Sequence, residues 1–266
     1  MSGLEGFHHS QLSLKTYREC PLRFRRRYLD RMWWSREWGA DEEQRGAIRT
    51  GQEFHLLASR HFWGMPSGTA SDDAVAGWLA ALEEFAPRRA GCRYLPEQEL
   101  RTAVGEGTLV AKYDLLELHP DGHAVIYDWK TSPQPPQAGR LARDLQTRLY
   151  RAVLCRAGTA LGESGWAPAA VSMVYWNPRF PAAPVRLPYS TAAYRRDWDH
   201  LTCLVAEIAA LGPGDFPATT REETCRRCEY RPLCRGEARE GTEPQEAEVD
   251  DAAWELSWEA VPELPL

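Results

Sequence analysis

Helical periodicity marks the first third of the chain. Apolar residues recur there every three to four positions, the spacing that places them on one face of a helix. In the first helical region Pro21 begins a second helix, because proline is tolerated at a first helical position. Ser13 and Ser71 precede apolar runs and are the expected N-caps. The predicted helices cover residues 10–30, 42–63 and 71–85.

After residue 90 the apolar pattern changes to the period of two that is typical of strands. Helical and strand-like segments then alternate as far as residue 211, so the chain is predicted to fold as a mixed α/β protein. The predicted strands cover residues 95–104, 109–118, 124–130 and 169–176, and the later helices cover residues 141–155 and 194–211.

One turn between two of these strands fixes a register. Residues 120–122 are Pro-Asp-Gly, which suits a three-residue hairpin loop made of a type I turn and a G1 bulge. This loop places Asp114 opposite Asp128, and opposite residues of an antiparallel pair share a face. Because side chains alternate along a strand, Lys130 lies on that face as well. The sequence therefore predicts two carboxylates and an ammonium group on one side of a hairpin.

The composition excludes two classes of protein. The chain has 266 residues, of which 43% are hydrophobic and 26% are charged, as is typical of a globular protein. Eleven Trp, ten Tyr and seven Phe are too many large aromatic residues for a chain that is disordered throughout. No apolar run approaches the roughly 20 residues of a membrane helix, and the first residues are polar where a secretory signal would be apolar. A cytoplasmic protein with no membrane association is expected.

Charge is distributed unevenly along the chain. The formal net charge is −6, but residues 237–266 carry ten acidic residues and one basic residue, which leaves residues 1–236 at +3. Residues 15–36 hold eight Lys and Arg against two acidic residues, a concentration that suits contacts with phosphates. A solvated helix face is the alternative interpretation of this basic run. The acidic segment is predicted to be a flexible tail, with docking to a partner or mimicry of DNA as the other interpretations.

The seven cysteines favour metal chemistry over a disulfide framework, because their number is odd and the chain lacks a secretory signal. Cys225, Cys228 and Cys234 form a C-x2-C-x5-C motif in a polar, Arg-rich stretch, and Cys20 can supply a fourth ligand. Four thiolates suit either tetrahedral zinc or a [4Fe-4S] cluster, and the spacing alone does not discriminate between the two. The remaining cysteines have apolar neighbours and are predicted to be small buried residues: Cys92, Cys155 and Cys203.

A series of motifs follows one order along residues 12–235. The motifs are Ser13-x-x-x-Tyr17 running into Cys20-Pro21, Gly51-x-x-x-His55, Asp114, Asp128-x-Lys130, Gln146-x-x-x-Tyr150 and the C-x2-C-x5-C motif. In these motifs and their order the chain resembles the RecB-like nucleases of the PD-(D/E)xK superfamily. In size and cysteine arrangement it resembles the CRISPR-associated RecB-like exonucleases of that group. Many relatives have Gly three residues before the second-motif aspartate, where this chain has Ala111.

The resemblance implies both a fold and a function. The fold would be a restriction-endonuclease-like mixed sheet core flanked by helices, formed by a nuclease domain over residues 1–236 ahead of the tail. The function would be a metal-dependent DNA nuclease, an exonuclease on single-stranded DNA or DNA ends, in DNA repair, recombination or CRISPR adaptation and defence. A lobe from residues 10–38 and 221–236 would hold a [4Fe-4S] cluster through four cysteines: Cys20, Cys225, Cys228 and Cys234.

Partner proteins are also implied by this resemblance, and a helicase or a CRISPR integrase is expected. The sequence contains no G-x-x-x-x-G-K-[ST] phosphate-binding loop, so any helicase motor would be a separate polypeptide.

Phosphodiester hydrolysis explains why these residue types would act together. The reaction needs charge neutralisation at the scissile phosphate and a nucleophile made from water, and divalent ions held by carboxylates supply both. Lys130 would orient the attacking water or stabilise the transition state. The predicted ligands of Mg²⁺ or Mn²⁺ are the side chains of His55, Asp114 and Asp128 and the main-chain carbonyl of Trp129. An imidazole among the ligands favours tolerance of Mn²⁺.

Two helix residues and one glutamate complete the predicted site. Gln146 and Tyr150 lie one helical turn apart and would position the substrate phosphate. Glu99, on the strand before the hairpin, is a further candidate carboxylate. Each of these residues has a simpler interpretation when taken alone, since strand carboxylates are usually solvated and buried histidines are usually structural.

Two other functions fit the same residues. In one, the protein is a DNA-binding scaffold subunit of a repair or adaptation complex, with weak or regulatory cleavage. In the other, the four cysteines hold zinc in a nucleic-acid-binding module without catalysis. Metal analysis separates the zinc-binding module from the nuclease, and a cleavage assay separates the DNA-binding scaffold from the nuclease.

Overall fold

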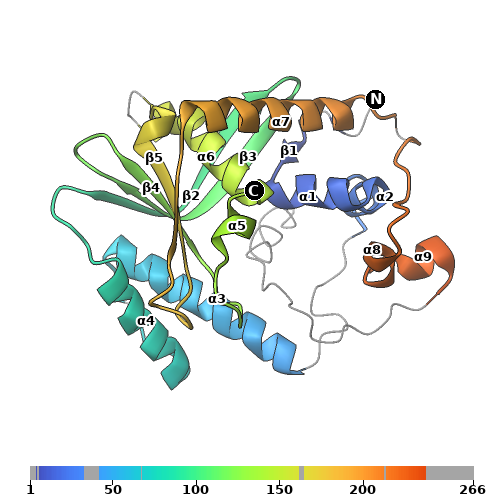
Figure 1. Cartoon of the computed structure of the whole chain (residues 1–266). Coiled ribbons are helices and arrows are strands. Elements are labelled where there is room, and N and C mark those ends of the chain that lie inside the picture. The colour runs from blue at the N-terminus through green and yellow to red at the C-terminus, as the bar shows by residue number, and fades with distance from the viewer. Residues whose placement is uncertain are drawn as a thin grey trace, which may run out of the picture.

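A six-stranded mixed β-sheet lies between two layers of helices (Figure 1). The computed structural model describes residues 4, 6–32, 42–66, 68–161, 165–212 and 214–237 of the chain. The strands are β1 (His8–His9), β2 (Arg93–Val104), β3 (Gly107–Leu118), β4 (Ala124–Trp129), β5 (Val171–Trp176) and β6 (Val185–Pro188). The larger helices are α1 (Gln11–Glu19), α3 (Glu42–Trp63), α4 (Asp73–Phe85), α6 (Leu145–Ala157) and α7 (Thr191–Ala209).

Shorter helical segments connect these elements. They are α2 (Pro21–Phe24), the π-helical η1 (Arg25–Leu29), α5 (Ala138–Leu141), the 3-10 helices η2 (Gly158–Leu161) and η3 (Pro168–Ala170), α8 (Glu222–Arg226) and α9 (Arg231–Arg235). Pro21 begins α2, as predicted. The mixed α/β fold predicted from the sequence is therefore confirmed, while β1, β6, α8 and α9 were not predicted because each is only a few residues long.

The sheet combines parallel and antiparallel neighbours. Its order is β1-β3-β4-β5-β6, and β2 pairs with β3 in addition. β1 pairs with the start of β3 and β4 with its end, whereas β2 pairs along nearly the whole of β3. The β2–β3, β3–β4 and β5–β6 pairs are antiparallel, whereas β1–β3 and β4–β5 are parallel. Because parallel neighbours need a crossover connection, the chain passes through α5 and α6 between β4 and β5.

The predicted β3–β4 hairpin is confirmed. The His119 N–H donates to the His123 carbonyl at 2.9 Å, and the Gly122 N–H donates to the His119 carbonyl at 3.1 Å. Gly122 has a φ of +85°, the left-handed conformation that the last residue of this loop requires. The resulting register pairs Leu115 with Tyr127, as the turn predicted.

Two helices begin at residues other than the predicted caps. Ser10, not Ser13, caps α1, because its side chain accepts a hydrogen bond from the Ser13 N–H. Asp72, not Ser71, caps α4 by accepting from the Val75 N–H, and Ser71 instead donates its main-chain N–H to Glu53 at 2.6 Å. In both cases several residues that can cap a helix lie close together, and the sequence pattern does not show at which of them the helix begins.

Each face of the sheet has its own apolar core. Helices α3 and α4 cover one face, where Phe54 and Phe62 pack with Trp129 and Trp176. Helices α1, α6 and α7 cover the other face, and Ala111 is fully buried there. Ala111, which replaces the glycine of many relatives, therefore fits within the packed core.

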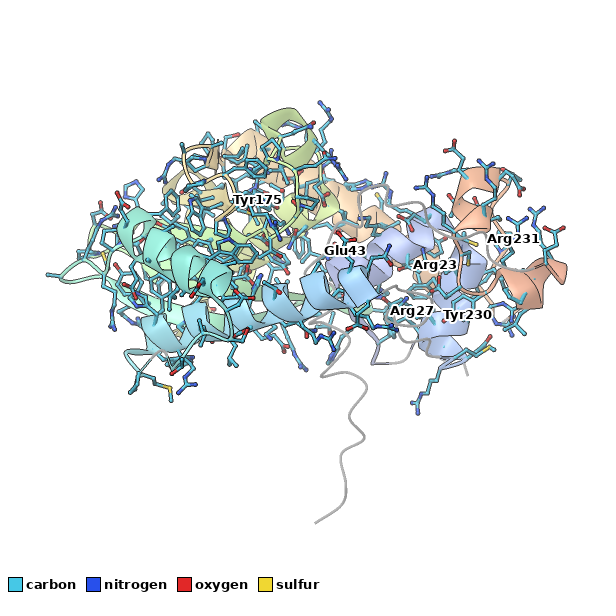
Figure 2. All side chains as sticks on the ribbon, turned by 90° about the horizontal axis from the view of Figure 1, so that it is seen from below. Arg23, Arg27, Glu43, Tyr175, Tyr230 and Arg231 are labelled. Carbon is cyan, nitrogen blue, oxygen red and sulfur yellow. The ribbon has the colours of Figure 1, made fainter. Side chains whose placement is uncertain are left out.

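A lobe formed by α2, η1, α8 and α9, which begins where α1 ends, lies to one side of the sheet (Figure 1). Glu229 in this lobe forms ion pairs with Arg23 at 2.9 Å and with Arg27 at 3.1 Å, so the two ends of the described chain are joined. Figure 2 shows Arg23, Arg27 and Tyr230 together in the lobe, apart from Tyr175 of the sheet. Two arginines of the predicted basic run are thus structural, which fits neither a solvated face nor a phosphate-binding surface at those positions.

Some predictions lie outside the described residues. They concern the acidic tail, of which only Glu237 is described, and the part of the proposed lobe at residues 33–38. Among the described helices, none has both the length and the apolar character needed to cross a membrane.

Candidate active site

Helix α3 brings His55 against the sheet. Gly51 and His55 lie one turn apart on the buried face of this helix, which explains the spacing of the G-x-x-x-H motif. The His55 side chain is only 3% exposed, and its Nδ1 lies 3.4 Å from Oδ1 of Asp114. The structure therefore joins two of the predicted metal ligands.

Asp114 lies where the side chains of β3 change face. Ala111 and Tyr113 belong to the core beneath α6, and so do Leu116 and Leu118, so the alternation shifts by one residue between positions 113 and 116. The shift places the half-buried Asp114 between the two layers of helices, within reach of α3. A strict period of two could not predict this position.

Glu97 joins the same group from β2. The register of β2 and β3 places Glu97 opposite Asp114, and its φ of +54° is the left-handed conformation that non-glycine residues rarely adopt. Donor atoms of His55, Glu97 and Asp114 all lie within 4.8 Å of one another. Burial and the adjacent Asp114 raise the pKa of Glu97, although Lys112, 2.7 Å away, partly offsets this effect.

A second polar group lies at the end of β4. Lys130 Nζ is 2.8 Å from Asp128 Oδ2 and donates to Gln146 Oε1 at 3.1 Å. Gln146 Nε2 in turn donates to Asp128 Oδ1 at 2.7 Å, so the three side chains form a closed triangle. Asp128 is 2% exposed, and the Lys130 ammonium lies 5.5 Å from the centre of the Tyr175 ring. This packing restricts the Lys130 side chain to one direction.

The main chain of Trp129 connects the two groups. Trp129 lies between Asp128 and Lys130 in sequence, and its N–H donates to Asp114 Oδ2 at 2.7 Å. Counted from the turn, the β3–β4 ladder ends at Leu115, which is next to Asp114 in sequence. Beyond this point the Asp114 side chain, and not the main chain, accepts the hydrogen bond from β4. The two groups therefore meet where the strands separate.

The structure brings some of the predicted metal ligands together and places others apart. His55 and Asp114 lie together as predicted, and the predicted contact of Asp128 with Lys130 is present. The group within 4.8 Å contains Glu97 as its third member, while Asp128 contacts Lys130 and Gln146. The roles assigned to these residues stay predictions.

The structure places Glu99, the further carboxylate suggested by the sequence, outside this group. Glu99 is 42% exposed and pairs with Arg101 at 2.6 Å on the protein surface. Glu97 is the carboxylate of β2 that lies near His55 and Asp114, and the sequence contains a signal for this position. Gly105 and Glu106 form a two-residue turn between β2 and β3, and counting back from this turn puts Glu97 opposite Asp114.

Helix α6 places Gln146 and Tyr150 differently. Asp144 caps the helix by accepting from the Gln146 N–H at 2.9 Å, which fixes the first turn beside Lys130. Tyr150 is buried, and its ring packs edge-on against Tyr113 with ring centroids 5.2 Å apart. Gln146 therefore contacts the polar group directly, whereas Tyr150 contributes to the core beneath it.

The four motif cysteines lie in the lobe. The Cys20 sulfur accepts from the Thr219 N–H at 3.4 Å, and the Cys225 thiol is 3.9 Å from the Thr219 carbonyl. Burial and Glu229 raise the pKa of Cys228 to about 11, and Cys20 contributes to the same rise. Cys234 is exposed. Among the described residues no three of these sulfurs lie within 4.8 Å of one another, so the cysteines do not form a closed ligand set.

Comparison with known proteins identifies the class. The PD-(D/E)XK nuclease superfamily profile matches residues 8–235, so the chain belongs to this superfamily and is a nuclease by membership. A solved structure from Eubacterium rectale, provisionally named an exonuclease, has 11% identity and a TM-score of 0.50, with 90% of each chain covered. The crystal structure of SSO0001 has 14% identity and a TM-score of 0.39, with 87% of each chain covered. No curated protein matches the sequence significantly.

Proposed function

We propose that this protein is a Mg²⁺- or Mn²⁺-dependent deoxyribonuclease that acts as an exonuclease on single-stranded DNA or DNA ends. The observation that carries the proposal is the hydrogen bond from the Trp129 N–H to Asp114, because it joins a carboxylate–imidazole group to a lysine-containing group. Membership of the nuclease superfamily supports the reaction, and the name of the Eubacterium rectale structure supports exonuclease action.

The donor atoms suit a hard divalent ion. His55, Asp114 and Glu97 offer one imidazole nitrogen and carboxylate oxygens, a set that Mn²⁺ and Mg²⁺ accept, with Asp128 close to the same strand ends. A bound ion would supply charge neutralisation at the phosphate and a more acidic water.

The other residues have roles that need no change of position. The Lys130 ammonium, held by Asp128 and Gln146, would donate hydrogen bonds to a phosphate oxygen as charge develops there. Gln146 would keep the lysine in one orientation, and Tyr150 would support that helix from the core. The substrate phosphate would therefore meet a fixed positive charge.

Replacing Glu97 tests both the nuclease and its ligand set. In a cleavage assay on end-labelled single- and double-stranded DNA, the wild type is expected to cut when Mg²⁺ or Mn²⁺ is added and not in chelator. The Glu97→Gln variant is expected to need about 10- to 100-fold more Mn²⁺ for half-maximal rate, because a carboxylate next to the ion is lost. The labelled end that shortens first gives the polarity.

Glu99→Gln is the matched control, because Glu99 lies two residues away on the same strand and is exposed. This control is expected to need the same Mn²⁺ concentration as the wild type. If Glu97→Gln and the wild type need the same Mn²⁺ concentration, Glu97 is not a metal ligand and only forms the ion pair with Lys112. A wild type that cuts neither DNA with either ion would remove the nuclease proposal and favour the DNA-binding scaffold.

We also propose that Cys20, Cys225, Cys228 and Cys234 hold a [4Fe-4S] cluster. Main-chain N–H groups point at two of the sulfurs, those of Cys20 and Cys228, as they commonly do at cluster ligands. The exposed Cys234 would have to move inward, which its place at the end of α9 allows, because the next residues, Arg235 and Gly236, end that helix. Zinc is the alternative occupant.

Metal analysis of anaerobically purified protein tests the cluster. Iron and sulfide in equal amounts, with visible absorbance that is lost in Cys228→Ser, are the expected result. Cys203→Ser, at an exposed cysteine of α7, is the control and is expected to keep the absorbance. If the protein is colourless and contains stoichiometric zinc, and Cys228→Ser loses that zinc, the four cysteines bind zinc and not an iron-sulfur cluster. A helicase or integrase partner stays a prediction that rests on the family resemblance.

A further inference from the structure

A second group of potential metal ligands lies at the open end of the β2–β3 hairpin, where β2 begins and β3 ends. Donor atoms of Cys92, Glu117 and His119 all lie within 4.8 Å of one another. Cys92 immediately precedes β2, Glu117 lies near the end of β3, and His119 follows β3 at the β3–β4 turn. Five residues of extended chain, roughly 16 Å, separate Cys92 from Glu97. The group is therefore distinct from the candidate active site.

The distances in this group match those around zinc. Cys92 Sγ lies 3.7 Å from His119 Nδ1. A tetrahedral zinc ion, with sulfur at about 2.3 Å and nitrogen at about 2.0 Å, holds the two atoms about 3.5 Å apart. Glu117 Oε1 lies 3.5 Å from the other ring nitrogen of His119. One donor atom from each of the three residues lies within 4.8 Å of the other two, so a single ion can lie among them.

The carboxylate of Glu117 is buried and held in place. Its side chain is 3% exposed, and it accepts hydrogen bonds from Tyr127 at 2.7 Å and Tyr94 at 3.1 Å. Hydroxyl donors of this kind orient a ligating carboxylate from behind. Arg89, 3.4 Å from the same carboxylate, is 55% exposed and can turn into solvent when a cation binds. The prediction that Cys92 is a small buried residue is wrong, since its side chain is partly exposed.

We propose that Cys92, Glu117 and His119 form a zinc-binding site. The donor set of one thiolate, one imidazole and one carboxylate combines the ligands that zinc accepts. Cys92 and His119 are both partly exposed, so the fourth position of the ion opens to water. Bound zinc would fasten the segment before β2 to the β3–β4 turn.

Zinc content of single variants tests the proposal. Full-length protein is stripped with a chelator, incubated with Zn²⁺, desalted and analysed for metal. Cys92→Ser and His119→Asn are each expected to hold about one zinc ion per chain fewer than the wild type. The matched controls are Cys203→Ser and His123→Asn, at exposed residues outside the group, and both are expected to hold as much zinc as the wild type.

Co²⁺ provides a second readout that reports the ligand itself. Bound to a thiolate, Co²⁺ absorbs strongly in the near ultraviolet through charge transfer, and the wild-type band is expected to be larger than that of Cys92→Ser. Any band that persists in Cys92→Ser belongs to the four-cysteine site. Equal zinc content and equal Co²⁺ spectra for the wild type, Cys92→Ser and His119→Asn would reduce the group to a metal-free hydrogen-bonded cluster. The nuclease assay is independent of this outcome.

Discussion

Lys130→Ala is expected to lower the rate of DNA cleavage by about 10²- to 10³-fold, equivalent to about 2.7–4 kcal/mol of transition-state stabilisation. The reason is the restriction of the Lys130 side chain. Asp128 and Gln146 hold its ammonium at 2.8 and 3.1 Å, and the Tyr175 ring lies beneath it. A charge fixed in advance stabilises a developing negative charge without reorganisation, so its loss affects the chemical step.

Single-turnover kinetics on end-labelled DNA at saturating Mn²⁺ would measure this loss. DNA affinity in Ca²⁺ and the thermal midpoint of unfolding serve as controls, and both are expected to stay close to the wild-type values. Gln146→Ala is a second variant, expected to give a smaller loss because the ammonium remains but is less well oriented. If Lys130→Ala cleaves DNA at the wild-type rate, Lys130 is not part of the catalytic centre, and the centre lies elsewhere than at the end of β4.

Glu229→Gln is expected to lower the free energy of unfolding by about 3–5 kcal/mol, the usual cost of removing one partner from a buried ion pair. The substitution removes the carboxylate that two guanidinium groups share, and the Arg27 side chain is only 4% exposed. Burial alone would raise the pKa of Glu229, but Arg23 and the hydrogen bonds to the carboxylate outweigh burial and hold it below its ordinary value.

The pH dependence of stability follows from that direction. A carboxyl group whose pKa is lowered by folding stabilises the protein above its unfolded pKa, and the contribution disappears as the pH falls through the folded pKa. Wild-type stability is therefore expected to fall on acidification below about pH 4.5, and Glu229→Gln is expected to lack this contribution. Urea unfolding at several pH values measures both effects, with the exposed Glu42→Gln as a control that changes little. Parallel curves for wild type and Glu229→Gln would contradict the assignment.

Local patterns were sufficient to predict most of the fold. The apolar period over residues 42–63 gives α3 with its observed bounds, and the Pro-Asp-Gly turn gives the register of β3 and β4. Both features depend on residues that are close in sequence. The capping residues were less predictable, since Ser10 and Ser13 lie within one turn and compete for the same role.

The candidate site was predictable only in part, because it depends on a local shift in the strands. His55 and Asp128 lie on regular elements and Lys130 directly follows β4, so the motif spacing indicates which side chains lie together. Glu97 lies where β2 takes a left-handed conformation, which no propensity of glutamate indicates. Cysteine burial was also unpredictable, since Cys203 proves to be exposed although its sequence neighbours are apolar. Exposure depends on which face a helix turns to the core.

The ion pairs of Glu229 also set an order of events during synthesis. Arg23 and Glu229 are 206 residues apart, so a ribosome that adds 5–20 residues per second needs roughly 10 to 40 s to deliver the acidic partner. Meanwhile the sheet and its covering helices can assemble, because all of these elements precede Glu229 in sequence. Closure of the lobe is therefore a late step, and the earliest helices to leave the ribosome are among the last to acquire all their native contacts.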